Sequence, residues 1–341
     1  MNENQVKELK SILTQPKKIT VVPHKSPDGD AVGSTTALKG YLDQLGHEVS
    51  LVTPNDFPKF LKWLPDADLF INVEQQPEKV EEIINAADLI FCLDHNDLSR
   101  TGELEKYLVK SKADFVMIDH HQQPGDFAKY TYSDTSMSST CQMVFHFLEM
   151  MQAIDVITPA MATSMYTGIL TDTGSFKFSS TTSTTLRVAA ALVDNGANPE
   201  MINRRIYDTN TPNRLKLLGT ALNNLVVLPE YRAAYITLSQ KEQDDHDFKK
   251  GDTEGFVNYA LSIDDIVFAQ IFLENKQEGI IKTSLRSKGT FNVNKMAREH
   301  WQGGGHNNAA GGKSDESLED TVTKLISILP AYEKELLATD I

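Results

Sequence analysis

The stretch Asp114-Phe115-Val116-Met117-Ile118-Asp119-His120-His121 joins an apolar run to three ionisable residues. Residues 114–118 are predicted to form a buried strand, because a short apolar run of this length is typical of a strand covered on both faces. In open α/β sheets, ligands bind at the carboxyl ends of the strands. Imidazole beside carboxylate is also a mixture that suits a divalent transition metal. A polar turn is the alternative interpretation of the last three residues when they are considered alone.

Similar strands and helices alternate along the rest of the N-terminal part. Strands are predicted at 18–23, 48–53, 68–73 and 88–93. Helices are predicted at 77–86, 101–111, 137–152, 158–170 and 183–195. After the first strand a polar loop at 24–30 precedes a helix that should start near Gly33, with Ser34 or Thr35 as its cap. This alternation predicts an α/β fold with a parallel, doubly wound sheet.

The pattern changes near residue 223, where hairpin-like strands begin. Strands are predicted at 225–228, 233–238, 266–274 and 279–286, and helices at 292–300 and 316–336. We therefore expect a first domain at 1–190, a helical linker at 191–222, and a smaller mixed α/β domain at 223–341.

Composition limits the partners and the compartment. The formal net charge of −14 argues against a protein that follows long duplexes by neutralising phosphates. The two cysteines, Cys92 and Cys141, lack C-x-x-C spacing, which favours a reducing compartment without disulfides or a zinc-thiolate site. The N-terminus has no apolar signal core, and no apolar run is long enough to span a bilayer. We expect a soluble cytoplasmic protein that does not bind membranes.

Several acids and imidazoles lie at predicted strand or helix ends of the first domain. They are His24, Asp28, Asp30, Asp94, Asp119, His120, His121 and Asp172. Because carboxyl strand ends share one edge of a parallel sheet, these residues should converge. Gly29 should let its loop turn so that Asp28 and Asp30 both face inward. Two His and four Asp are too many ligands for one ion and suit two, an arrangement that supports in-line phosphoryl displacement.

This series of residues resembles the motifs of the DHH phosphoesterase superfamily. The run Gly303-Gly304-Gly305-His306 with Ala309-Ala310-Gly311-Gly312 resembles the DHH-associated C-terminal domain of the first type. The resemblance covers nearly the whole chain in the family's order. Length and layout are similar to the nanoRNase and pAp-phosphatase branch.

The resemblance implies roles for the residues of the first domain. His24, Asp28 and Asp94 would hold one ion. The other ion would be held by Asp30, Asp94, His120 and Asp172, so that Asp94 bridges the pair. Asp119 would orient an imidazole, and His121 would contact the substrate phosphate or orient a ligand, which makes these two the expected catalytic residues. The implied cofactor is a pair of Mn²⁺ ions, with Mg²⁺ or Co²⁺ as substitutes.

Substrate contacts are expected mainly in the second domain. The Arg286 guanidinium could bind a phosphate as a fork, with Ser287 beside it. The backbone N–H groups of Gly303, Gly304 and Gly305 could form an anion nest, to which His306 adds a donor. A flexible turn is the alternative for the glycine run. Arg100 in the first domain is expected either to contact a phosphate or to form a surface ion pair.

The implied activity is two-metal, in-line hydrolysis of phosphate esters. The expected substrates are short oligoribonucleotides (nanoRNA), cleaved to mononucleotides, and 3′-phosphoadenosine 5′-phosphate (pAp), cleaved to AMP and phosphate, with pApA as a further candidate. Relatives often pair, so a homodimer is expected. An inorganic pyrophosphatase or polyphosphatase with the same metal centre is one alternative, although the glycine-rich tail argues against it. A non-catalytic nucleotide-binding protein is another.

Overall fold

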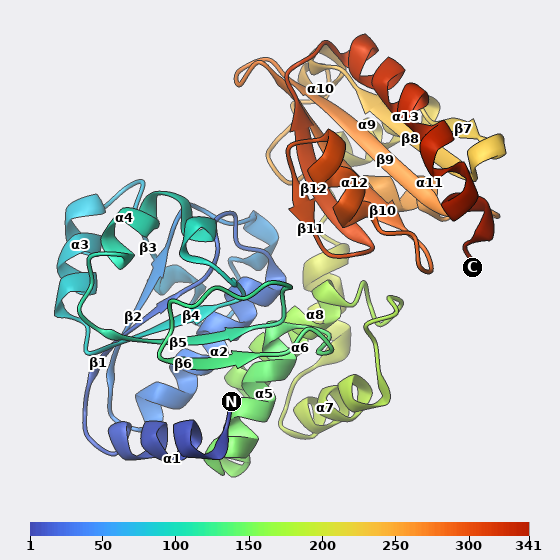
Figure 1. The fold of residues 1–341 in the computed structure, drawn as a ribbon. Coiled ribbons are helices and arrows are strands. Elements are labelled where there is room, and N and C mark those ends of the chain that lie inside the picture. The colour runs from blue at the N-terminus through green and yellow to red at the C-terminus, as the bar shows by residue number, and fades with distance from the viewer. Residues whose placement is uncertain (341) are drawn as a thin grey trace. The chain divides into compact units, whose positions relative to one another are not determined.

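A computed structural model describes residues 1–340, which form two compact units that meet in the sequence between Thr209 and Asn210 (Figure 1). The segment expected as a linker is helical. Its helix α8 (Pro199–Tyr207) belongs to the first unit, and its helix α9 (Pro212–Asn223) belongs to the second. Within residues 1–340, no helix combines the length and apolar character needed to cross a bilayer.

The first unit contains a six-stranded parallel sheet in the order β3-β2-β1-β4-β5-β6. The strands are β1 (Lys18–Val22), β2 (Glu48–Thr53), β3 (Ile71–Asn72), β4 (Leu89–Leu93), β5 (Asp114–Asp119) and β6 (Tyr130–Ser133). This sheet confirms the predicted α/β class. The strand expected at 68–73 is reduced to β3, because a 3₁₀ turn occupies Ala67–Leu69. Strand β6 was not predicted.

Helices cover both faces of this sheet, as Figure 1 shows for α3 and α4 on one side and α1 and α2 on the other. The helices are α1 (Glu3–Ile12), α2 (Gly29–Gln44), α3 (Pro77–Ala86), α4 (Glu105–Leu108), α5 (Thr140–Met151), α6 (Pro159–Asp172) and α7 (Ser183–Asp194). In β4, Leu89, Phe91 and Leu93 pack in the core that contains α1, α2, α5 and α6. Ile90 and Cys92 pack in the core with α3 and α4. Burial on both faces explains the continuous apolar strands.

The predicted cap of α2 is wrong. The helix begins at Gly29 and its N-cap is Asp28, whose carboxylate accepts hydrogen bonds from the N–H groups of Asp30 and Ala31 at 3.0 and 3.1 Å. Ser34 and Thr35 lie inside the helix, where their hydroxyls donate to the Ala31 carbonyl. Asp, Ser and Thr are all good caps, so local sequence alone does not choose among them.

Glycines allow α2, α5 and α6 to approach closely. A Cβ atom at Gly33 would lie 2.4 Å from the Ser164 carbonyl oxygen, and one at Gly168 would lie 2.2 Å from Cys141 Sγ. Gly29 is helical and does not make the turn we expected. It is small because a Cβ there would lie 2.4 Å from Thr171 Oγ1. These contacts bring the first turn of α2 against the last turns of α6.

The second unit contains a mixed six-stranded sheet in the order β11-β12-β10-β9-β8-β7, with only the β8–β9 pair parallel. The strands are β7 (Val226–Leu228), β8 (Ala233–Leu238), β9 (Phe268–Asn275), β10 (Ile280–Ser287), β11 (Gly304–Gly305) and β12 (Ala309–Ser314). The remaining helices are α10 (Gln240–Asp244), α11 (Phe256–Leu261), α12 (Val293–His300) and α13 (Leu318–Ala338). Phe268 and Phe272 pack with α12 and α13, while Ala269 and Ile271 pack with α9 and α11.

The close packing of α6 predicts that Gly168→Ala destabilises the first unit. The added methyl would meet Cys141 Sγ and Asp30 Oδ1, the latter at 2.8 Å. Overpacking of this kind costs about 1–3 kcal/mol, which urea denaturation followed by circular dichroism would measure. The matched control is Gly219→Ala in α9, where a Cβ meets nothing within 4 Å. That change should stabilise its helix by about 0.5–1 kcal/mol. Equal unfolding midpoints for the two variants would contradict the packing argument.

Candidate metal centre

The strand order places the candidate ligands at one edge of the first sheet. The order β3-β2-β1-β4-β5-β6 changes direction between β1 and β4, where open α/β sheets bind ligands outside the carboxyl strand ends. His24 follows β1, Asp94 directly follows β4, and His120 directly follows β5. Asp28 and Asp30 lie in the first turn of α2, and Asp172 is the last residue of α6.

Six of the predicted ligands form two adjacent groups with metal-ligand spacing. One group is His24, Asp28 and Asp94, and the other is Asp30, His120 and Asp172. In each group the candidate ligand atoms lie within 4.8 Å of one another. The Asp94 carboxylate reaches both, because its Oδ2 lies 3.4 Å from His24 Nε2 and its Oδ1 lies 3.5 Å from His120 Nε2. The predicted bridging position of Asp94 is therefore compatible with the geometry.

Backbone carbonyls orient the two imidazoles of these groups. His24 Nδ1 lies 2.9 Å from the Lys25 oxygen, and His120 Nδ1 lies 3.2 Å from the Met137 oxygen. Because a carbonyl only accepts, each Nδ1 carries a hydrogen, and Nε2, which faces the carboxylates, is the ring atom that a cation could bind. Such second partners are typical of metal-ligating histidines.

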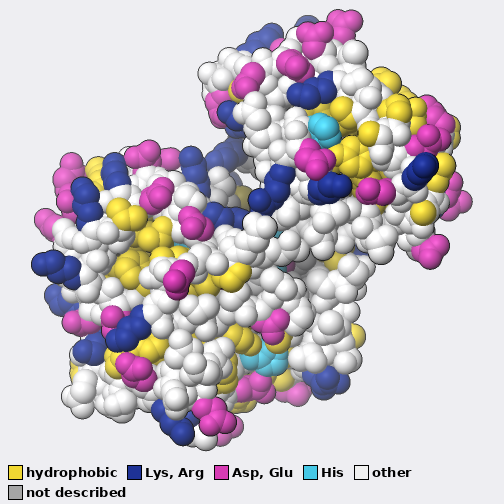
Figure 2. All heavy atoms as spheres, viewed as in Figure 1, with side chains coloured by type: hydrophobic (Ala, Val, Ile, Leu, Met, Phe, Trp, Pro, Cys, Tyr) yellow, Lys and Arg dark blue, Asp and Glu magenta, His cyan; other side chains and the backbone are white. Residues whose placement is uncertain are grey.

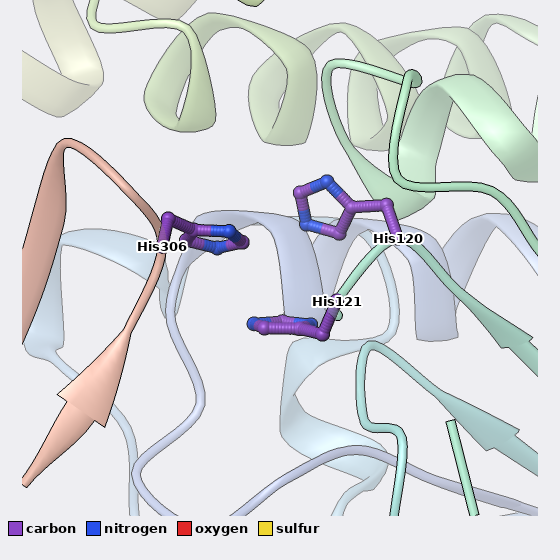
Figure 3. A group of neighbouring side chains, drawn as sticks. All are labelled: His120, His121 and His306. Carbon is purple, nitrogen blue, oxygen red and sulfur yellow. The ribbon is translucent and has the colours of Figure 1, made fainter. Parts of the chain in front are cut away.

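His121 is held by Asp119 instead. Its Nδ1 lies 2.7 Å from Asp119 Oδ1, and its backbone N–H donates to Asp119 Oδ2 at 2.9 Å. Figure 3 shows the rings of His120 and His121 projecting from the loop after β5. Asp119 is fully buried. The imidazole that it orients lies next to the candidate ligands.

The charges of the cluster shift one another's pKa values. Burial raises the pKa of Asp172 to about 7, and the carboxylates of Asp28 and Asp94 add to this. Burial and the Asp94 and Asp172 carboxylates likewise raise the pKa of Asp30. Burial lowers the pKa of His24, but Asp94 and Asp28 outweigh it and raise the value to about 9. His120 and His24 hold the pKa of Asp94 below its usual range against the effect of burial.

This donor set fits a pair of divalent cations. Asp30 and Asp94 are 1% and 2% exposed, and buried carboxylates are stable only when they are paired or coordinate metal. Even when both imidazoles are protonated, their positive charge does not neutralise the four carboxylates, and net negative charge remains for cations to compensate. Asp94 also has a φ of +62°, a conformation that costs a non-glycine residue energy and that clusters at functional sites.

The N-terminus of α5 also contacts the cluster, which the sequence did not reveal. The N–H groups of Thr140 and Cys141 donate to the two oxygens of Asp30 at 2.6 and 2.8 Å. The only local signal is the run Ser138-Ser139-Thr140, in which Ser139 caps the helix.

Comparison with known proteins identifies the family. The model described as "DHH family, N-terminal domain" matches residues 18–169, and the DHHA1 domain matches residues 230–334. The bifunctional oligoribonuclease and PAP phosphatase NrnA of Thermus thermophilus is 31% identical over 86% of this chain and 83% of its own length. The chain belongs to the DHH family.

Two further relatives agree with this assignment. The protein of the same name from Bacillus subtilis is 28% identical over 84% of this DHH-family chain and 86% of its own. A crystal structure of an exopolyphosphatase-related protein from Bacteroides fragilis is similar with a TM-score of 0.95 and 36% identity, covering 98% of both chains.

The residues predicted to bind substrate lie in both units. Arg100 is half-buried in the DHH-domain unit, and its charge acts on the buried His95. In the DHHA1 unit, Arg286 lies on β10 opposite Ala309 of β12, and its Nη1 donates to the Leu285 oxygen. Ser287 is buried, and its hydroxyl donates to the Phe291 oxygen and accepts from Asn308. Ser287 thus supports the strand beside Arg286.

Two of the three glycine N–H groups that we expected in an anion nest donate hydrogen bonds within their own unit. Gly303 N–H donates to the Ala297 oxygen, Gly305 N–H to Asn294 Oδ1, and His306 N–H to the Ala309 oxygen. The glycines instead permit close strand pairing, because a Cβ at Gly303 would lie 1.9 Å from the Gly311 oxygen. His306 comes from the turn between β11 and β12 (Figure 3).

The pKa shifts predict that metal affinity increases with pH. In the metal-free protein His24 holds its second proton below about pH 9 and Asp172 holds a proton below about pH 7, and a cation that binds at either group must displace the proton there. Each displaced proton changes the affinity about tenfold per pH unit. From pH 6 to 8 we expect the Kd for Mn²⁺ to fall on the order of 100-fold at the group with His24 and about tenfold at the group with Asp172, with proton release. Calorimetric titration in buffers of different ionisation heat measures both. An unchanged Kd without proton release would contradict the assignment.

Proposed function

We propose that this protein is a manganese-dependent phosphoesterase that hydrolyses short oligoribonucleotides to mononucleotides and pAp to AMP and phosphate. The observation that carries the proposal is the Asp94 carboxylate, which lies between two groups of ligand atoms at the edge of the sheet. The names of the relatives from Thermus thermophilus and Bacillus subtilis support the substrate class.

In this proposal His24, Asp28 and Asp94 hold one cation, and Asp30, Asp94, His120 and Asp172 hold the other. When bound, such a pair of divalent ions would supply activation of a water molecule and stabilisation of negative charge on the reacting oxygens of a phosphoryl displacement. The chain fixes the orientation of His24 and His120, because the Nδ1 atom of each ring is hydrogen-bonded to a backbone carbonyl. This leaves Nε2 as the atom that would bind a cation. Mn²⁺ suits a site of imidazoles and carboxylates without thiolates.

His121 and Asp119 would act on the substrate. Because Nδ1 of His121 is engaged by Asp119, contact with a phosphate oxygen falls to Nε2. The buried Asp119 carboxylate fixes the orientation of that imidazole. Arg100 supplies a cation on the same unit for a neighbouring phosphate.

The DHHA1 unit would select short substrates. Arg286 and His306 offer side-chain donors for a terminal phosphate. The face of this unit visible in Figure 2 carries acidic and basic side chains interspersed. With a net charge of −14, such a surface gives a long polyanion little to bind.

Two other substrate classes remain candidates. The linear dinucleotide pApA carries the same ester linkage as a short oligoribonucleotide. Polyphosphate is suggested by the name of the Bacteroides fragilis structure. Both would use the same metal centre.

The test is a Mn²⁺-dependent assay with pAp, a diribonucleotide, pApA and pyrophosphate side by side. We expect the diribonucleotide and pAp to give the highest kcat/KM. Asp94→Asn keeps the shape but removes the charge shared by both ions, so its rate should fall by more than the roughly 10- to 100-fold caused by loss of an outer metal partner. A preference for pyrophosphate, or a variant with wild-type rate and metal content, would overturn the proposal.

The proposed anchoring role of Arg286 predicts that Arg286→Ala raises KM for pAp while kcat and Mn²⁺ binding remain unchanged. Loss of a charge-assisted phosphate contact is worth about 1.5–3 kcal/mol, or roughly 10- to 150-fold in KM. The matched control is Lys282→Ala, a cation on the same strand whose ion-pair partner is Glu278. If both variants shifted KM equally, Arg286 would have no specific role.

A further inference from the structure

The first turn of α5 contacts two candidate ligands through three hydrogen bonds. Thr140 N–H and Cys141 N–H each donate to one oxygen of Asp30. The Thr140 hydroxyl donates to Asp94 Oδ1 at 3.0 Å. Thr140 is fully buried, so water does not compete for these bonds. One residue therefore contacts carboxylates assigned to both ions.

The segment before α5 is held rigidly in this position. Ser139 caps the helix by accepting from Gln142 N–H at 3.0 Å. The Gln142 side-chain oxygen accepts from the hydroxyls of Ser138 and Thr185 at 2.6 and 3.0 Å. The same segment supplies the Met137 carbonyl that orients His120. These bonds fix the segment around Thr140 and so hold its hydroxyl in position as a donor.

The Thr140 hydroxyl distinguishes the two oxygens of Asp94. The terminal torsion of an Asp side chain is broad and roughly two-fold, so the side chain alone does not fix how its carboxylate plane lies. The hydroxyl bonds Oδ1, which faces His120, while Oδ2 faces His24. A bridging carboxylate must direct one oxygen to each ion, and this bond holds it in that orientation.

We propose that Thr140 is a positioning residue that fixes the Asp94 carboxylate in its bridging orientation. It would thereby set the affinity for the cation that binds second, after the first site is filled. This inference rests on the proposed two-metal function. The backbone bonds to Asp30 do not depend on the Thr140 side chain. Substitution of that side chain therefore isolates the bond to Asp94.

The test compares Thr140→Val, which keeps the shape and loses the hydroxyl, with Thr140→Ser, which keeps the hydroxyl. Mn²⁺ binding is measured without substrate by calorimetry and by the electron paramagnetic resonance signal of the coupled ion pair. We expect the Val variant to bind its second ion 10- to 100-fold more weakly, as for other outer partners of metal ligands. Its coupled signal should be lost at limiting Mn²⁺, and kcat should recover at high Mn²⁺. The Ser variant should resemble the wild type.

Thr321→Val in the second unit is the matched control. This threonine is equally buried, and its hydroxyl donates to Ser314 of the same unit. It should leave Mn²⁺ binding unchanged. Wild-type binding of both ions by Thr140→Val would overturn the inference, and so would a Ser variant as weak as the Val variant. If the wild type binds two ions but hydrolyses none of the nucleotides, the proposed function fails while the positioning role remains supported.

Discussion

Electrostatic repulsion among the carboxylates of Asp30, Asp94 and Asp172 is the constraint on which the first unit depends. Burial and this repulsion raise the pKa values of Asp30 and Asp172. Such a cluster is stable only when positive charge or hydrogen-bond donors compensate it. His24 and His120 supply part of the compensation, and the N–H groups at the start of α5 supply more. The remaining negative charge is what a cation site requires.

Apolar packing in the rest of the first unit holds these like charges close together. The sheet between two helical layers fixes the ends of β1, β4 and β5 side by side. Small residues at Gly29, Gly33 and Gly168 then allow α2 and α6 to meet without intervening side chains. The cost of the cluster, and of the positive φ at Asp94, is thus met by apolar burial in the same unit.

The convergence of the candidate ligands was predictable, because the carboxyl ends of parallel strands must share an edge. Apolar runs identified β1, β4 and β5, and the residues after them followed directly. Contacts between segments were not predictable in the same way. Asp28, Ser34 and Thr35 are all good caps, and only packing against α6 selects the first. The family resemblance implied that Asp119 orients an imidazole, but nothing local indicates that this is the ring of His121, or that a threonine at residue 140 contacts Asp94.

The second unit shows why the glycine run at 303–305 does not by itself decide how its N–H groups are used. Glycines favour both an anion nest and close strand pairing. In a nest the N–H groups face the anion, whereas in close strand pairing they donate to other groups of the protein. Here Gly303 and Gly305 donate within their own unit, so their amides are used for folding. If this unit binds a phosphate as proposed, the recognition would rely mainly on side chains, and Arg286 and His306 are the proposed contacts. In the proposed function, a metal pair would attract any phosphate, so discrimination among substrates would fall to these side chains rather than to the metal centre.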